Sequence, residues 1–371
     1  MKIGLLTVPF NNNYGGLLQA YALKTILTDM GHEVHIINRR RNPSNSLKFR
    51  LYHLLVRLHV IQDYLSDKTK SISVNTELFK RKYLEPITEP YYSSKDLLRC
   101  LELRIDAFVV GSDQVWRYRY ARESIDDYFF SFLKGSRIPR FSYAASFGTE
   151  EMDYPDDKRV IATELLKEFS AISVREESGR DILVNWLGVD PMKAKVVLDP
   201  TLLLSPDKYV NIFKGQRFCD DNYLFTYVLD ASLCDYTAIN SFVVSSGLKQ
   251  MNLKAQTGDI RKLEIIEPIE KWLSGIYYSQ CVITDSFHGT VFSIIFNKPF
   301  IVVANPIRGL TRIKSLLSKF GLEDHLVVDL GVSYRDVLNR RVDWFMVNQK
   351  LQEWKELSIQ YLIDAINSIS N

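Results

Sequence analysis

A short polar segment, residues 284–290, combines the residue types needed for acid/base chemistry. It carries Asp285, Ser286 and His288, and it lies between the apolar run 281–283 and the helix-like run 291–296. A strand that ends in this way and turns into a helix places a proton carrier beside backbone N–H groups that favour anions. An isolated histidine is more often a structural hydrogen-bonding group, but ligands usually sit at the carboxyl ends of strands in α/β proteins. The segment predicts acid/base chemistry on a phosphorylated ligand.

Two further polar segments follow predicted strands. The first, residues 13–15, would offer backbone amides to a sugar, and the second, residues 112–116, would offer it a carboxylate and an aromatic ring. The alternatives are a plain turn for the first segment and an Asp that caps a helix for the second. Neither segment is a GxGxxG or Walker loop, so nicotinamide and P-loop functions have little support. The candidate acceptor-binding residues are Asn13, Tyr14 and Gly15 in the first segment, and Ser112, Asp113, Gln114 and Trp116 in the second.

Arg175 follows the predicted strand 171–174. A guanidinium binds a carboxylate or phosphate through two parallel hydrogen bonds, whereas lysine acts as a point charge. Arg175 is therefore a candidate anion-binding residue. The alternative is a surface ion pair with Glu176 or Glu177.

Strand and helix patterns alternate along the whole chain. A βαβ pattern opens it, with a strand at 3–8, a helix at 17–30 and a strand at 33–37, and the alternation restarts with a strand at 223–229. Such alternation indicates parallel sheets with helices on both faces, and 371 residues exceed what one core usually supports. We expect an α/β protein with two Rossmann-like domains facing a cleft, at 1–205 and 206–371. The terminal helix 343–368 is expected to cross back to the first domain.

Composition excludes several classes of function. The chain has 47 basic and 44 acidic residues, a net charge of +3, so it has no global field that favours nucleic acid. Its four cysteines are widely spaced, with no CxxC and no zinc-type histidine spacing. We therefore expect no nucleic-acid partner, no metal and free thiols.

Localisation follows from the apolar runs. None approaches the roughly 20 residues that span a bilayer, and the N-terminal strand has the wrong length and flanks for a signal peptide. We expect a cytoplasmic protein. The basic segment 39–62 leaves two interpretations open: a peripheral contact with the inner face of the membrane, or, as we favour, a solvated helix or lid over the cleft.

Six motifs in one order resemble the polysaccharide pyruvyl transferase family over about 300 residues. Besides the histidine segment, they are residues 13–23, 109–116, 142–148, 172–176 and 198–201, and residues 312–317 extend the similarity. The resemblance implies the GT-B architecture. It also implies transfer of a pyruvyl group from phosphoenolpyruvate to two sugar hydroxyls, in surface or exopolysaccharide biosynthesis.

The resemblance also implies roles for individual residues. His288 would be the general acid or base, and Asp285 would orient it or the acceptor. Arg175 matches the arginine of the family that holds phosphoenolpyruvate, and the amides of Gly289 and Thr290 would receive its phosphate. Ser286 stands where the best-known members carry an arginine, so either Arg308 or Arg312 supplies the second cation or the donor is held differently.

The scheme needs phosphoenolpyruvate as a co-substrate and no further cofactor. The second domain would be the donor side and the first the acceptor side, for a saccharide that is free, nucleotide-linked or lipid-linked. Two rival functions stay open. One is a GT-B glycosyltransferase that uses a nucleotide sugar, and the other is a non-catalytic sugar-binding homologue.

Overall fold

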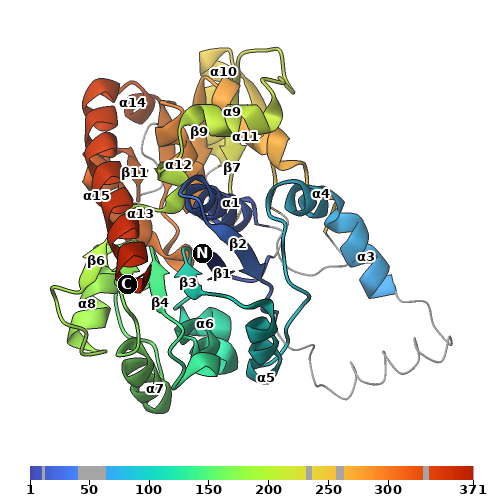
Figure 1. Cartoon of the computed structure of the whole chain (residues 1–371). Helices are drawn as coiled ribbons and strands as arrows, with labels where there is room; N and C mark the ends of the chain where they lie inside the picture. The colour runs from blue at the N-terminus through green and yellow to red at the C-terminus, as the bar shows by residue number, and fades with distance from the viewer. Residues whose placement is uncertain (11–12, 41–63, 231–235, 256–262, 329–333, 371) are drawn as a thin grey trace.

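A parallel sheet with strand order β2-β1-β3-β4 forms the first half of the molecule. The computed structural model describes residues 1–10, 13–40, 64–230, 236–255, 263–328 and 334–370 (Figure 1). Isolated bridges join β4 to β5, and β5 pairs with β6, so the sheet continues to six strands. The strands are β1 (Lys2–Leu6), β2 (Glu33–Ile37), β3 (Ala107–Gly111), β4 (Arg140–Tyr143), β5 (Ile172–Val174) and β6 (Ala194–Val196).

Helices connect these strands, as expected for parallel pairing. The α-helices are α1 (Tyr14–Asp29), α3 (Tyr64–Ile72), α4 (Val74–Tyr83), α5 (Ser94–Leu97), α6 (Tyr118–Ala121), α7 (Asp156–Leu166) and α8 (Glu177–Asn185). Short 3-10 helices are η1 (Leu98–Leu103), η2 (Arg122–Phe129) and η3 (Ser131–Leu133). The predicted domain boundary, between residues 205 and 206, lies between η4 (Pro200–Leu202) and α9 (Pro206–Phe213).

The second half contains a five-stranded parallel sheet of order β11-β10-β9-β7-β8. Its strands are β7 (Tyr223–Tyr227), β8 (Lys249–Asn252), β9 (Cys281–Thr284), β10 (Phe300–Val303) and β11 (Leu326–Val327). Its helices are α10 (Tyr236–Ser246), α11 (Ile269–Tyr278), α12 (Phe287–Ile295), η7 (Pro306–Arg308), α13 (Leu310–Phe320), η8 (Glu323–His325) and α14 (Tyr334–Leu338).

Both sheets have the doubly wound order in which the first strand lies between the second and the third. In such sheets a crevice opens at the carboxyl ends of the two strands where the order reverses, and ligands bind there. These strands are β1 and β3 in the first half, and β7 and β9 in the second. The topology therefore predicts a site built from the loops that follow them.

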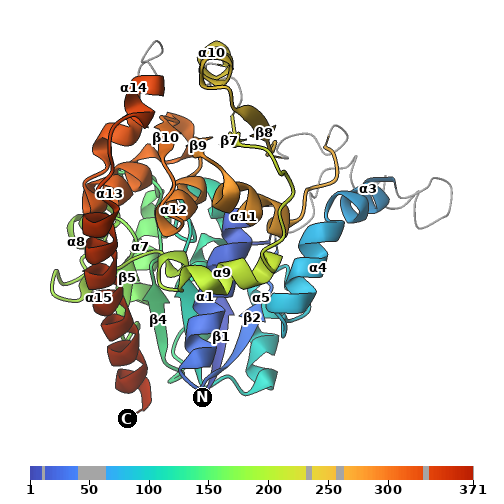
Figure 2. The same ribbon diagram turned by 90° about the horizontal axis from the view of Figure 1, so that it is seen from above.

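The terminal helix α15 (Trp344–Ser370) crosses from the second half back to the first (Figures 1 and 2). The Tyr361 hydroxyl donates to the carbonyl of Ser142 on β4, at 2.8 Å, and the Leu198 N–H donates to Ser358 Oγ, at 3.0 Å. The largest buried apolar cluster includes residues of α1, α12 and α15, so the two halves share a core. This confirms the predicted architecture.

Most of the basic segment 39–62 lies outside the described residues. Its first residue, Arg39, is buried and donates to Asp127 at 2.7 Å, so this side chain is not available to a membrane surface. Among the described helices, none is both long and apolar enough to cross a membrane.

Candidate functional site

Five ionisable side chains from both halves gather where the carboxyl ends of the two sheets meet. Asp113, Arg175 and Asp199 follow β3, β5 and β6, while His288 lies in the first turn of α12 and Arg312 in that of α13. All five are buried. We call this set the interdomain cluster.

Arg175 is held by carboxylates of its own half. Its Nη1 lies 2.5 Å from Asp199 Oδ2, and its Nη2 lies 3.3 Å from Asp113 Oδ1. Asp113 adopts a left-handed conformation, with φ of 58°, and so does Ser112, with φ of 27°. Such conformations outside glycine are uncommon and are often found at functional sites.

Arg312 reaches the same carboxylate from the second half. Its Nη1 lies 3.4 Å from Asp113 Oδ1, the atom that Arg175 also contacts. The ring of Phe287 lies beside both guanidiniums, with its centroid 4.2 Å from the Cζ of Arg175 and 5.4 Å from that of Arg312. One carboxylate and one aromatic ring thus bring two arginines of opposite halves together.

His288 lies between Asp199 and the first turn of α1. Its Nε2 is 3.6 Å from Asp199 Oδ2. A Cβ built on Gly15 would lie 2.0 Å from His288 Nδ1, so only glycine at this position leaves room for the ring. Gly15 therefore helps to place His288.

The charges within the cluster shift one another's pKa values. Burial alone would raise the pKa of Asp113 and Asp199, but neighbouring cationic side chains hold both below the ordinary value. Burial lowers the pKa of Arg312 to about 10, and the charge of Arg175 adds to this shift. Arg312 therefore carries its charge at an electrostatic cost that an additional anion would relieve.

Several buried polar atoms of the cluster have no hydrogen-bond partner in the described part of the chain. They include His288 Nε2, Arg175 Nε and Arg312 Nε, together with Oε2 of the adjacent Glu176. Buried polar groups are normally satisfied. These three nitrogens could therefore each form a hydrogen bond with a polar group of a ligand.

Asp285 lies in another network. Its carboxylate accepts the N–H groups of Leu229 and Asp230, at 2.6 and 3.1 Å, and the side-chain amide of Asn305 at 2.8 Å. It fixes the loop after β7 and is not the residue beside His288. This corrects the expectation that Asp285 orients His288, and we assign that contact to Asp199.

The turn at the start of α12 uses its own amides. Ser286 is the N-cap residue: its Oγ accepts the N–H of Gly289 at 3.3 Å, and its carbonyl accepts that of Thr290 at 3.0 Å. The expectation that these two amides receive a phosphate does not fit this conformation, because both are already bonded.

Arg308 also differs from expectation. It forms a two-point ion pair with Asp230, at 2.8 and 3.0 Å, so its charge is already balanced. Of the two arginines considered as the second cation, Arg312 is the one that lies beside Arg175.

The candidate acceptor residues divide into two groups. Trp116 is fully buried, stacks on Phe129 and donates to the Tyr128 carbonyl, so its ring offers no face to a sugar. Tyr14 is also buried, and its hydroxyl donates to the Glu267 carbonyl across the two halves. These two aromatic residues therefore have packing roles, which corrects the expectation that they bind the acceptor.

The polar candidates make local hydrogen bonds. Asn13 is exposed and caps α1, Gln114 accepts from Arg117 at 2.5 Å, and Ser112 donates to Asp199 at 3.1 Å.

Two members of the site were not predicted as site residues. Asp199 and Glu176 both lie in the sequence motifs, and each follows a strand directly or closely. That position is the signal that could have identified them. The sequence around Asp199 also fits a residue that caps the turn 199–201. Asp199 has this role as well, since it accepts the N–H of Thr201 at 3.0 Å.

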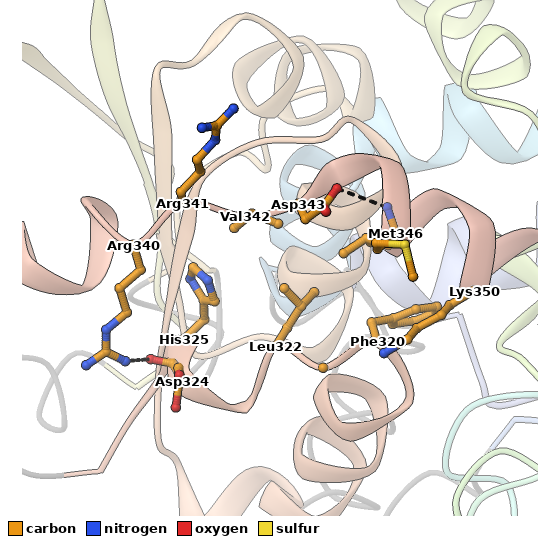
Figure 3. Close-up of a pocket in the computed structure, with 12 residues that line it drawn as sticks. Phe320, Leu322, Asp324, His325, Arg340, Arg341, Val342, Asp343, Met346 and Lys350 are labelled. Carbon is orange, nitrogen blue, oxygen red and sulfur yellow. Dashed lines mark hydrogen bonds between the residues drawn. The ribbon is translucent and has the colours of Figure 1, made fainter.

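The described residues contain no group of three or more potential ligands arranged to hold a metal ion. A separate cavity of about 300 Å³ lies between η8, the end of α13 and the start of α15, and His325 and Lys350 line it (Figure 3). Gly321 caps the C-terminus of α13, whereas Arg312 lies in its first turn. This cavity therefore lies at the opposite end of α13 from the interdomain cluster.

Comparisons with known proteins agree with this architecture. A family model described as polysaccharide pyruvyl transferase matches residues 13–306. No curated protein matches the sequence. Among solved structures, a UDP-GlcNAc 2-epimerase of Methanocaldococcus jannaschii is similar at 13% identity and a TM-score of 0.53, covering 95% of this chain and 99% of that one. Arabidopsis thaliana UGT89C1, complexed with UDP-L-rhamnose, is similar at 10% identity and a TM-score of 0.54, covering 98% of each chain.

Proposed function

The chain belongs to the polysaccharide pyruvyl transferase family, and we propose that it transfers a pyruvyl group from phosphoenolpyruvate to two hydroxyls of a sugar. The product would be a cyclic ketal within a surface polysaccharide or exopolysaccharide, and phosphate would be released. One observation carries this proposal. Arg175 and Arg312 reach one carboxylate from opposite halves, next to His288.

The charge of the cluster supports a strongly anionic donor. A phosphate ester and a carboxylate together carry about −3 near pH 7, and such a charge is costly to bury without cations. Arg175 and Arg312 would supply two guanidiniums, which bind planar anions through paired hydrogen bonds. In this structure both guanidiniums contact the carboxylate of Asp113. The bound donor would replace these contacts, wholly or in part.

His288 would move the proton. In the reaction, the methylene carbon of phosphoenolpyruvate gains a proton while a sugar hydroxyl attacks the neighbouring carbon, and a positioned acid or base accelerates such steps. Its Nε2 forms no hydrogen bond among the described residues and lies 3.6 Å from Asp199 Oδ2, which supports this role. Asp199, 3.6 Å away, would hold the ring and stabilise its protonated form.

The acceptor would enter from the first half. Asn13, two residues before Gly15, and the loop 112–114 border the cluster in the first half, whereas the second half supplies His288 and Arg312. The acceptor would be a saccharide, free or attached to a nucleotide or lipid, and the reaction would take place in the cytoplasm or at the inner face of the membrane. No metal or further cofactor takes part in the scheme.

A nucleotide-sugar glycosyltransferase would use the same architecture. The similar solved structures are only 10–13% identical to this chain, and such a likeness concerns the fold and not the site. Nothing in the interdomain cluster favours a nucleotide over phosphoenolpyruvate. We therefore retain the pyruvyl transfer.

Phosphate release tests the proposal. Purified protein is incubated with phosphoenolpyruvate and a panel of methyl glycosides of galactose, glucose, mannose and N-acetylmannosamine, and the products are analysed by mass spectrometry for a ketal. We expect release that depends on a saccharide and falls on the order of 100-fold or more in His288→Ala. Release that continues unchanged in this variant would remove His288 from the mechanism, and no release with any saccharide would count against the proposed function.

A further inference from the structure

Ketal formation moves two protons, and this sets a requirement for the site. Each of the two sugar hydroxyls loses a proton. One proton ends on the methylene carbon of the donor, and the other leaves with the phosphate. The acceptor and donor atoms lie on different sides of the reacting carbon, so two proton carriers serve the reaction better than one. This requirement rests on the proposed function.

Glu176 is the carboxylate of this region that is free to act as the second carrier. Its Oε1 accepts from Ser146 Oγ at 2.6 Å and from the Gly148 N–H at 3.4 Å. Its Oε2 is buried and has no hydrogen-bond partner among the described residues, and its ion pair with Arg175 Nε is long, at 3.6 Å. One oxygen therefore fixes the side chain, while the other accepts no hydrogen bond in this part of the structure.

The two neighbouring carboxylates form closer ion pairs. Asp199 Oδ1 accepts from the N–H and the hydroxyl of Thr201, and its Oδ2 accepts from Ser112 and lies 2.5 Å from Arg175 Nη1. Asp113 Oδ1 lies 3.3 Å from Arg175 and 3.4 Å from Arg312. Such contacts suit counterions, because a paired guanidinium favours the charged form of a carboxylate and so weakens it as a base.

Glu176 also lies where the two halves touch. It bonds to Gly148, and a Cβ added to Gly309 of the second half would lie only 3.0 Å from the Gly148 carbonyl and 2.9 Å from Arg312 Nε. The side chains of Glu176 and Arg312 thus lie on the two sides of one contact between the halves. A ligand bound between the halves would meet both.

We propose that Glu176 is a second catalytic residue, which exchanges protons with the acceptor and the leaving phosphate. Protonated His288 gives its proton to the methylene carbon while Glu176 takes the proton of the first attacking hydroxyl, and a C–O bond forms. The C–O bond to phosphate then breaks, and Glu176 gives its proton to the phosphate. The second hydroxyl attacks the same carbon and passes its proton to neutral His288, so both residues return to their starting states.

An isosteric substitution separates catalysis from folding. In Glu176→Gln, the amide oxygen can still accept from Ser146 and Gly148, but the side chain cannot take a proton. We expect turnover of phosphoenolpyruvate to fall on the order of 100-fold or more, with the melting temperature and the KM for phosphoenolpyruvate close to wild type. Glu177→Gln is the matched control, because Glu177 is 59% exposed and pairs with Lys319 at the surface; it should retain full activity.

Chemical rescue gives a readout that a structural role would not produce. Added formate should restore part of the activity of Glu176→Ala and should have no effect on wild type or on Glu177→Ala. Three results would overturn the proposal: Glu176→Gln within a few-fold of wild type, a loss of donor affinity and stability without rescue, or rescue of Asp113→Ala but not of Glu176→Ala. If wild type itself releases no phosphate with any saccharide of the panel, the proposed function fails, and this inference fails with it.

Discussion

At the scale of residues, the site is a set of opposed charges held out of water. Asp113 and Asp199 balance Arg175, and Arg312 adds a further positive charge from the second half. Removing one partner of a buried ion pair is costly when the other charge is left unpaired, whereas replacing the whole pair with apolar side chains of similar volume is often neutral or stabilising. Arg312 is the member whose charge is least favoured by its surroundings.

Arg312→Met should therefore stabilise the unliganded protein while it removes donor binding. The folded protein holds fewer protons than the unfolded chain above about pH 10, because the pKa of Arg312 is lowered to about 10. The contribution of this group to stability consequently rises as pH passes upward through that value, and it is unfavourable at pH 7. Asp113 keeps its contact with Arg175 in this variant, so we expect the free energy of unfolding at pH 7 to rise by up to about 3 kcal/mol, the value that corresponds to the lowered pKa, measured by urea denaturation.

The matched variant is Arg308→Met. Arg308 is paired at two points with Asp230, so its loss leaves a carboxylate without its partner and should not stabilise the fold. A lower stability of Arg312→Met than of wild type, with phosphoenolpyruvate still binding normally, would contradict the assignment of Arg312 to the donor site.

The residue scale also shows what sequence reasoning can identify. His288, Arg175 and Arg312 could be selected because each follows or neighbours a predicted strand end. The carboxylate beside His288 could not be selected in this way. Asp285 is close to His288 in sequence, whereas Asp199 is brought next to it only by the fold. Trp116 was misjudged because polar neighbours suggested a loop, whereas the chain turns back into the core after the left-handed residues 112 and 113.

At the scale of elements, the first turn of α1 packs against that of α12. Gly15 allows this approach because its missing side chain leaves room for His288. The strands and most helices were predictable from alternation and apolar periodicity. The close approach of two helices was not, because it depends on how the halves are placed relative to one another.

Gly15→Ala should displace His288 and reduce turnover on the order of 100-fold, as expected when a general acid or base is misplaced. Gly16→Ala is the control on the same turn: its added Cβ would have no neighbour closer than 3.8 Å. Alanine favours helix over glycine by up to about 1 kcal/mol, so the control should be active and at least as stable as wild type. Phosphate release gives the activity of both variants, and thermal melting gives their stability. If Gly15→Ala were as active as wild type, the position of the His288 ring beside Gly15 would not be needed for turnover.

At the scale of the whole molecule, the two sheets occupy separate halves and α15 ties the second half to the first (Figure 2). The alternating elements predict two α/β units, and the family resemblance implies how the two units are arranged. They could not give the pairing of charges between the halves, which depends on side chains more than a hundred residues apart in sequence. That pairing links the stability of the molecule to pH.

The protein should lose stability in acid partly through the interdomain cluster. Against the opposing effect of burial, Arg175 and His288 hold the pKa of Asp113 below the ordinary value of about 3.9, and contacts with His288 and Arg175 do the same for Asp199. Their stabilisation is complete above that pH and is lost as pH falls below it. We expect the melting temperature to drop steeply between about pH 4 and pH 2, and less steeply in Asp113→Asn. Asp156→Asn, at a side chain 92% exposed, should keep the wild-type slope, and an unchanged slope in Asp113→Asn would contradict this account.

Binding of the donor is the most direct test of the central claim, that phosphoenolpyruvate is bound between the halves by Arg175 and Arg312. Isothermal titration calorimetry would compare phosphoenolpyruvate and UDP on wild type, Arg175→Lys and Arg312→Met. The account predicts that wild type binds phosphoenolpyruvate and not UDP, that Arg175→Lys binds it more weakly because the guanidinium fork is lost, and that Arg312→Met loses most of the affinity. Binding of UDP without phosphoenolpyruvate, or equal phosphoenolpyruvate affinity in all three proteins, would contradict it.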